Sequence, residues 1–232
     1  MQSLIDEAAF ELSTAATLEK SIEAMKLGSE PYNLTYAKTL LKSYQCNGGE
    51  LVKESVVADI LIMGMMRLPS SDYLELSYLV PTTLVSSRNG GNESAKIALV
   101  MKCANYLERS QFAEFWLELN ANSDSKTIFD SVHSFESNIR SYILGNISET
   151  FQNISRSVLL KLLGFDVDGS NTILEQFLSS SNNSDVEYTI KTDRIEFIVK
   201  DKNVEKISKK NELSLKTEDL FVLVSTIRNS SV

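Results

Sequence analysis

Few side chains of this chain are of the types that perform acid–base, nucleophilic or metal chemistry, and they are widely spaced. The single histidine is His133, and the two cysteines are Cys46 and Cys103. General acid–base catalysis and metal binding both require several such groups within reach of one another. His133 has no second histidine or nearby cysteine, and the cysteines stand 57 positions apart without a CxxC spacing. These residues predict neither a catalytic centre nor a zinc site, so we expect a protein that is not an enzyme.

One acidic run resembles the start of a calcium loop, Asp166-x-Asp168-Gly169. An EF-hand loop needs glycine at its sixth position and glutamate at its twelfth. Here Gly169 stands at the fourth position and the next acid, Glu175, at the tenth. We interpret Asp168 or Ser170 as the N-cap of the following helix. The phosphate-binding patterns GxGxxG and GxxxxGK[ST] are absent from the chain, and we predict no cofactor and no metal.

The charge balance argues against a strong nucleic-acid binder. The formal net charge is −8, divided into −6 before Phe135 and −2 from Phe135 onward. Sequence-independent binding to nucleic acid needs an excess of lysine and arginine, which neither half offers.

The segment Met1–Phe10 lacks the basic and apolar regions of a signal peptide, and no apolar run reaches the roughly 18 residues of a membrane span. We therefore expect a cytoplasmic protein, with nuclear presence also compatible, reduced cysteines and no membrane partner.

Helical periodicity dominates the first two thirds of the chain. The first helix ends at Gly28 and Pro31, and Ser86–Glu93 is a loop. The other predicted helices cover about Leu34–Cys46, Lys53–Arg67, Asp72–Leu79, Ile97–Leu107 and Phe112–Leu119. Short helices joined by short turns pack as antiparallel neighbours. We predict a mainly α protein whose residues 1–134 form a stack of helical hairpins, similar to HEAT or TPR arrays but without a fixed sequence period.

The pattern changes at Phe135. Three helices are predicted, over about Phe135–Ile147 with Ile128–Val132 as a candidate extension, over Arg156–Leu163 between Ser155 and Gly164, and over Asn171–Leu178. Two alternating segments, Val186–Ile190 and Ile195–Val199, then predict a β-hairpin that turns at Thr192-Asp193. Three helices followed by a hairpin is the order of a winged helix. Residues 135–232 are therefore predicted to form a winged-helix domain with a C-terminal helix.

A winged helix raises the alternative of DNA binding, because its third helix can enter the major groove. Here the segment Asn171–Ser181 contains no lysine or arginine and one glutamate, whereas base and phosphate contacts depend on lysine and arginine. The lysines between Lys200 and Lys210 are interleaved with acids, and we interpret them as a solvated linker. Little direct nucleic-acid binding is expected.

Several strings, in order and spacing, resemble one scaffold family. They are Leu41-Lys-Ser-Tyr44-Gln45-x-Asn47, Leu68-Pro69-x-x-Asp72-Tyr73, Tyr106-Leu107-Glu108-x-x-x-Phe112-x-x-Phe115-Trp116, Phe135-Glu136-x-x-Ile139-Arg140-x-Tyr142-Ile143 and Ser155-x-x-x-Leu159-Leu160-x-x-Leu163-Gly164. A helical stack leading into a winged helix resembles the PCI scaffold proteins, and these strings are similar to the K-subunit family of eukaryotic translation initiation factor 3. The resemblance runs from about Leu34 to Val204; the segment Ser86–Glu93 and the wing depart from it.

The resemblance implies a non-catalytic scaffold subunit of the initiation factor 3 complex. Its partners would be other subunits, especially subunit L, and through the complex the small ribosomal subunit during translation initiation. One alternative is a PCI-type scaffold subunit of the proteasome lid or the COP9 signalosome. A second alternative, from a different class, is a winged-helix nucleic-acid-binding protein.

The resemblance also implies where partners dock, because winged-helix edges of PCI proteins join side by side. A two-stranded wing leaves an edge unpaired, and the predicted pairing strand carries Ile195, Glu196, Phe197 and Val199. The second predicted surface is the C-terminal helix, with Leu220, Phe221, Leu223, Val224 and Ile227. The alternative that these residues close the core of their own domain stays open.

Overall fold

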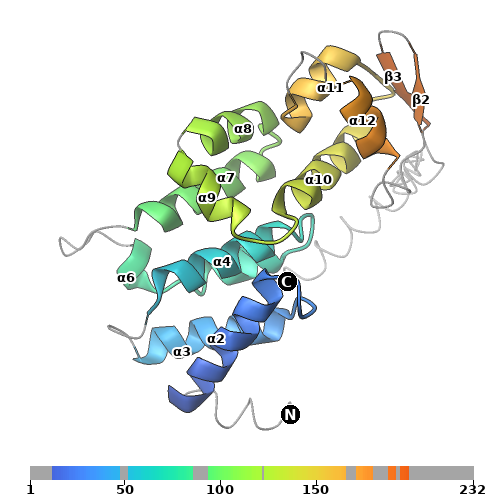
Figure 1. Ribbon diagram of the computed structural model, residues 1–232. Helices are drawn as coiled ribbons and strands as arrows, with labels where there is room; N and C mark the ends of the chain where they lie inside the picture. Colours follow the sequence, from blue (N-terminus) through green and yellow to red (C-terminus); the bar gives the residue numbers. More distant parts are fainter. Residues whose placement is uncertain are drawn as a thin grey trace, which may run out of the picture. The chain divides into compact units, whose positions relative to one another are not determined.

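The computed structural model describes residues 12–47, 52–85, 94–121, 123–165, 171–179, 188–191 and 194–198 (Figure 1). These residues all lie in one compact unit that ends at Ile198. They are mainly helical and include one three-stranded antiparallel sheet, which confirms the predicted fold class. The predicted boundary between residues 134 and 135 falls inside this unit, and the division into two domains stays a prediction.

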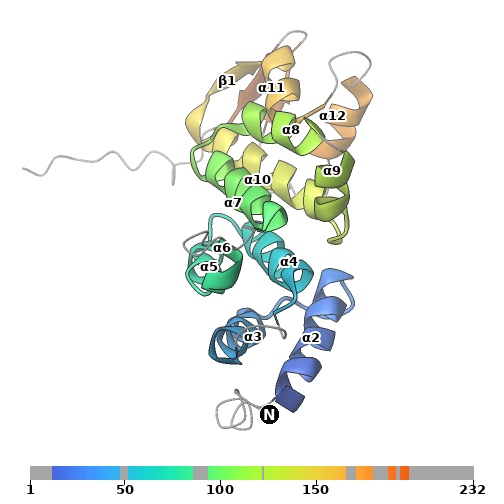
Figure 2. The same cartoon turned by 90° about the vertical axis from the view of Figure 1, so that its left-hand side faces the viewer.

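The helices of the N-terminal stack follow one another in chain order from blue α2 to green α9 (Figure 2). They are α2 (Leu12–Lys26), α3 (Leu34–Asn47), α4 (Glu54–Met65), α5 (Asp72–Ser77), α6 (Thr82–Val85), α7 (Ala95–Glu108), α8 (Phe112–Ala121) and α9 (Ser123–Asp130). Helix α2 packs against α3 and α4, and α4 also packs against α5 and α7. Helix α7 packs against α8, which packs against α9. Helix α4 is buried from Val57 to Met65 because its sequence is apolar on nearly every side.

The predicted extension of the next helix through Ile128–Val132 is wrong. Helix α9 ends at Asp130, and α10 (Phe135–Thr150) begins only after Ser134, whose φ of 58° is left-handed. Between the two helices, the amide of His133 donates to the carbonyl of Lys26 on α2 at 2.9 Å. The chain thus turns to bond with the first helix pair, a tertiary contact that local periodicity does not reveal.

The remaining elements have the order of a winged helix. They are α10, β1 (Asn153–Ser155), α11 (Arg156–Leu163), α12 (Asn171–Leu178), β2 (Tyr188–Ile190) and β3 (Arg194–Phe197). The strand order is β1-β3-β2, with both pairs antiparallel. Ile154, Ile195 and Phe197 are buried on the inner face of the sheet. Strand β1 was not predicted, because its single buried residue, Ile154, sets up no alternation.

One cluster, which we name the Arg140 junction, joins α8, α10 and the end of α11. The Arg140 guanidinium lies 5.0 Å from the ring centroid of Trp116 and 4.6 Å from that of Phe165. Its Nε donates to the Leu163 carbonyl at 3.1 Å, and a terminal nitrogen pairs with Glu136 at 2.8 Å. The Trp116 indole donates to the Leu162 carbonyl at 2.9 Å. These contacts fix the end of α11 against the helical stack.

Candidate partner-binding surface

The strand predicted to pair with a partner lies in the middle of the sheet. Glu196 stands opposite Asn153 on β1 and opposite Thr189 on β2. The predicted free edge on this strand is therefore wrong, because the unpredicted β1 occupies it. Ile195 and Phe197 are 0% and 5% exposed, which makes them core residues of this sheet. Their role in partner binding stays a prediction.

The other predicted contact residues lie outside the described part of the chain. They are Val199, Leu220, Phe221, Leu223, Val224 and Ile227, and the same holds for the Thr192-Asp193 turn. The docking role of the C-terminal helix therefore also stays a prediction.

The outer strands β1 and β2 each have one edge without a strand neighbour among the described residues. Phe197 donates its amide to the Gln152 carbonyl at 2.9 Å, and Lys191 donates to the Arg194 carbonyl at 2.9 Å. Antiparallel ladders alternate between bonded and non-bonded residue pairs. The backbone groups of Asn153 on β1 and of Ile190 on β2 consequently point away from β3.

Two large apolar side chains lie on the outer face of the sheet next to β1. Phe151 is 48% exposed and Ile198 is 54% exposed. The β1–β3 register, continued by two residues, places them opposite each other. We call Phe151, Ile198 and the outward backbone of Asn153 the β1 patch. Sequence reasoning missed Phe151 because it directly follows a helix end, where one apolar residue forms no pattern.

The third helix of the winged helix offers little to a nucleic acid. Helix α12 reads NTILEQFL and carries no lysine or arginine. Its Glu175 pairs with Arg156 of α11 at 2.9 Å, and its Ile173 is 49% exposed. Arg156 is held by a carboxylate, and α12 itself presents no cation where DNA-reading helices present them.

The side chains that could take part in nucleophilic or metal chemistry lie far from one another. Cys46 is exposed on α3, whereas Cys103 is buried on α7, and burial raises the pKa of its thiol to about 12. The described residues contain no group of three or more His, Cys, Asp or Glu side chains that could hold a metal ion. The same residues include no helix that is long and apolar enough to span a bilayer.

Among the described residues, the least exposed ion pair joins α2 to α4. Lys26 Nζ lies 2.9 Å from Asp59 Oδ2, with side-chain exposures of 17% and 9%. The hydroxyl of Ser131 approaches the other carboxylate oxygen at 3.5 Å. Burial raises the pKa of Asp59, and the hydrogen bond from Lys26 partly opposes that rise. Together with Ser131, the pair links three segments of the chain, which indicates a structural role.

Comparison with known proteins relates the chain to one family. The family model described as CSN8/PSMD8/EIF3K matches residues 51–184. Among curated relatives, the eukaryotic translation initiation factor 3 subunit K of Dictyostelium discoideum is 32% identical over 154 residues, which cover 66% of this chain and 57% of the relative. The subunit K of Brugia malayi is 35% identical over 162 residues, which cover 64% of this chain and 65% of the relative. That of Caenorhabditis briggsae is 30% identical over 173 residues, covering 68% of both chains.

The matches with the first two relatives thus span 57% and 65% of their lengths, which is less than two thirds. The matched region of the family model includes α4 to α12 and β1, so it contains most of the helical stack and the helices of the winged helix. The resemblance seen in the sequence strings is confirmed. The chain belongs to the CSN8/PSMD8/EIF3K family.

Proposed function

We propose that this protein is a non-catalytic scaffold subunit of translation initiation factor 3. Its proposed location is the cytoplasm, and a location in the nucleus is the alternative. Several relatives in the family carry the name of its subunit K, which supports the choice of complex. The observation that carries the scaffold role is the β1 patch, where two exposed apolar side chains lie beside a strand edge that has no neighbour among the described residues. Such an edge accepts a strand of another chain through backbone hydrogen bonds, while apolar side chains beside it add affinity.

The proposed partner at this patch is another subunit of the complex, in the first place subunit L. Contact with the small ribosomal subunit would follow through the assembled factor. The β1 edge is favoured over the β2 edge because Phe151 lies beside β1 and is 48% exposed, whereas the aliphatic residue on β2, Ile190, is 38% exposed.

We expect the substitution Asn153→Pro to weaken binding of subunit L by at least about tenfold while the monomer stays folded. Proline removes an outward amide that takes no part in the β1–β3 ladder, so the cost falls on pairing with a partner strand. Co-purification of tagged variants with subunit L measures binding, and circular dichroism measures folding. The matched control Ile190→Pro removes the outward amide of the opposite edge and should leave binding intact.

A folded Asn153→Pro variant that co-purifies fully would contradict pairing at β1. Loss of subunit L with Ile190→Pro alone would move the docking edge to β2. The family description also includes subunits of two other assemblies, so the proteins that co-purify with the tagged wild-type chain decide between complexes. Proteasome-lid or signalosome subunits in place of initiation factor 3 subunits would overturn the proposed complex.

Direct RNA binding by the isolated chain should be weak. With no cation on α12 and a net charge of −8, we expect a dissociation constant above about 10 μM near physiological salt, in the non-specific range. Fluorescence anisotropy with a labelled single-stranded RNA tests this. Sub-micromolar binding that disappears when Lys206, Lys209 and Lys210 are neutralised would favour the nucleic-acid-binding alternative.

A further inference from the structure

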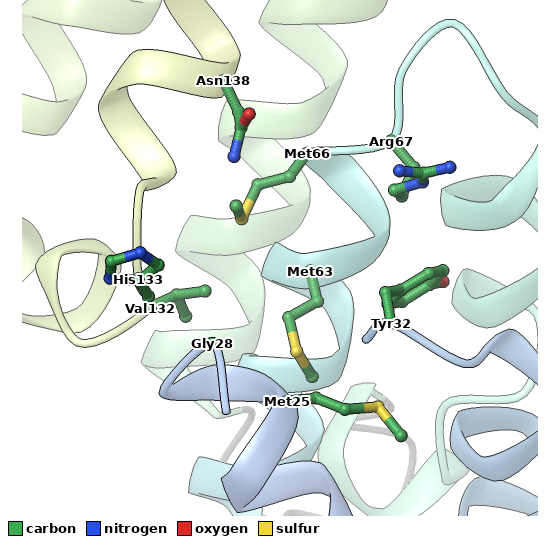
Figure 3. Close-up of a pocket in the computed structure, with 9 residues that line it drawn as sticks. All are labelled: Met25, Gly28, Tyr32, Met63, Met66, Arg67, Val132, His133 and Asn138. Atoms are coloured by element: carbon green, nitrogen blue, oxygen red, sulfur yellow. The ribbon is translucent and has the colours of Figure 1, made fainter. Parts of the chain in front are cut away.

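A cavity of about 180 Å³ lies where the end of α2, the end of α4 and the segment before α10 meet (Figure 3). Its floor is apolar, formed by Met25, Met63 and Val132, which are 7%, 5% and 3% exposed. The half-buried Met66 adds a third thioether to the lining. Figure 3 shows the three methionine side chains between Val132 on one side and Tyr32 on the other.

The rim of the cavity differs in character from its floor. Arg67 and His133 are exposed there, and no aspartate or glutamate lines the cavity. The Arg67 guanidinium lies 5.7 Å from the ring centroid of Tyr32, and no carboxylate among the described residues forms an ion pair with it. The Asn138 amide adds a polar group at the opposite side (Figure 3). The rim thus presents a cation that forms no ion pair among the described residues, while burial, together with the nearby Asp72 and Glu75, raises the pKa of the neighbouring Tyr32 hydroxyl.

The rim is held in place by backbone contacts. His133 is bonded through its amide to the carbonyl of Lys26 at 2.9 Å. Gly28 has a φ of 75°, and a Cβ atom there would lie 2.8 Å from Cδ2 of the His133 ring. The His133 ring therefore packs directly against Gly28. The neighbouring Lys26–Asp59 pair fixes α2 to α4 on the same side, so the cavity is part of the folded stack.

The volume indicates the size of the occupant. An apolar cavity of about 150 Å³ is large enough to bind benzene. A cavity of about 180 Å³ therefore admits one phenylalanine- or leucine-sized side chain. Methionine side chains are flexible and polarizable, and they adapt to ring or aliphatic shapes.

We propose that this cavity is a docking pocket for one large apolar side chain of a protein partner, next to a carboxylate of the same segment that pairs with Arg67. The apolar floor selects the side chain, and the unpaired guanidinium at the rim selects the acid. The pocket is built from the helical stack and the first turn of α10, away from the sheet, so the proposal does not rest on partner pairing at the β1 patch.

The test uses 3-phenylpropionate, which joins a phenyl ring to a carboxylate, and its neutral counterpart 3-phenylpropanamide. The readout is the NMR signals of the methionine methyl groups, of which the chain has six. We expect saturable shifts at Met25, Met63 and Met66 with a millimolar dissociation constant, typical of so small a ligand. The signal of Met101 on α7, which does not line the cavity, should stay unchanged.

The substitution Arg67→Gln should weaken the binding of 3-phenylpropionate about three- to fivefold, because an exposed charge pair contributes modestly to affinity. The binding of 3-phenylpropanamide should not change. The control Arg109→Gln changes an exposed arginine that does not line the cavity and should alter neither ligand. The peptide acetyl-Phe-Glu-amide should shift the same three signals. Absence of saturable shifts, equal binding of acid and amide, or binding of 3-phenylpropionate without the peptide would each overturn the proposal.

Discussion

Replacing Gly164 by alanine should lower the free energy of unfolding by about 3 kcal/mol, within the large-effect class of backbone and overpacking substitutions. Gly164 ends α11 with a φ of 69°, a conformation that side chains with a Cβ rarely adopt. A Cβ atom there would lie 2.4 Å from Cδ2 of Trp116, so the indole must move. That movement would disturb the stacking of Trp116 on Arg140 and the indole bond to the Leu162 carbonyl.

The matched control is Gly145→Ala in the middle of α10. A Cβ atom at Gly145 meets nothing within 4 Å. Alanine is favoured over glycine in a helix interior by about 1 kcal/mol, so this variant should be more stable than the wild type. Urea unfolding followed by circular dichroism measures both changes. Equal stability of the Gly164→Ala variant and the wild type would show that Trp116 does not pack on Gly164.

Replacing Lys26 by methionine should cost about 3 kcal/mol at pH 7, because it leaves the carboxylate of Asp59 buried without its cation. The long apolar side chain retains most of the packing of the lysine stem, so the loss reflects the charge. The control Lys53→Met breaks the pair with Glu19, in which the lysine side chain is 58% exposed, and should cost less than about 1 kcal/mol.

The pH dependence distinguishes loss of charge pairing from loss of packing. Burial already raises the pKa of Asp59 above its ordinary value of 3.8, so the native state binds this proton more readily than the unfolded state. The contribution of Asp59 to stability therefore rises as pH falls from the raised native pKa toward 3.8. Removing Lys26 raises that pKa further. The loss of unfolding free energy caused by Lys26→Met should therefore be smaller at pH 5 than at pH 7. A deficit that is equal at both pH values would contradict this account.

The helices were largely predictable because their signals are local. The segment Asn171–Leu178 was predicted with the observed bounds, and the predicted Leu34–Cys46 differs from α3 by one residue. Ser155 and Gly164 were predicted as the ends of α11, and both stand at its caps. Apolar spacing and end signals are properties of neighbouring residues, which explains why a single sequence reveals them.

The sheet and the candidate site were less predictable, for a physical reason. Strand β1 exists because Ile154 meets Ile195, and these residues stand 41 positions apart. Only that distant pairing makes β3 the central strand and moves the open edges to β1 and β2. The cavity likewise combines Met25, Met63 and Val132 from three separate segments. Surfaces assembled from segments this far apart leave no periodic pattern in the chain.

The position of Trp116 has a practical consequence. It is the only tryptophan in the chain, and its indole lies between α8, Arg140 and the end of α11. All intrinsic tryptophan emission therefore originates at the Arg140 junction. A change in emission wavelength or quenching would report separation of the winged helix from the helical stack, without an attached dye, and partner docking elsewhere would leave the spectrum unchanged unless it strained this contact.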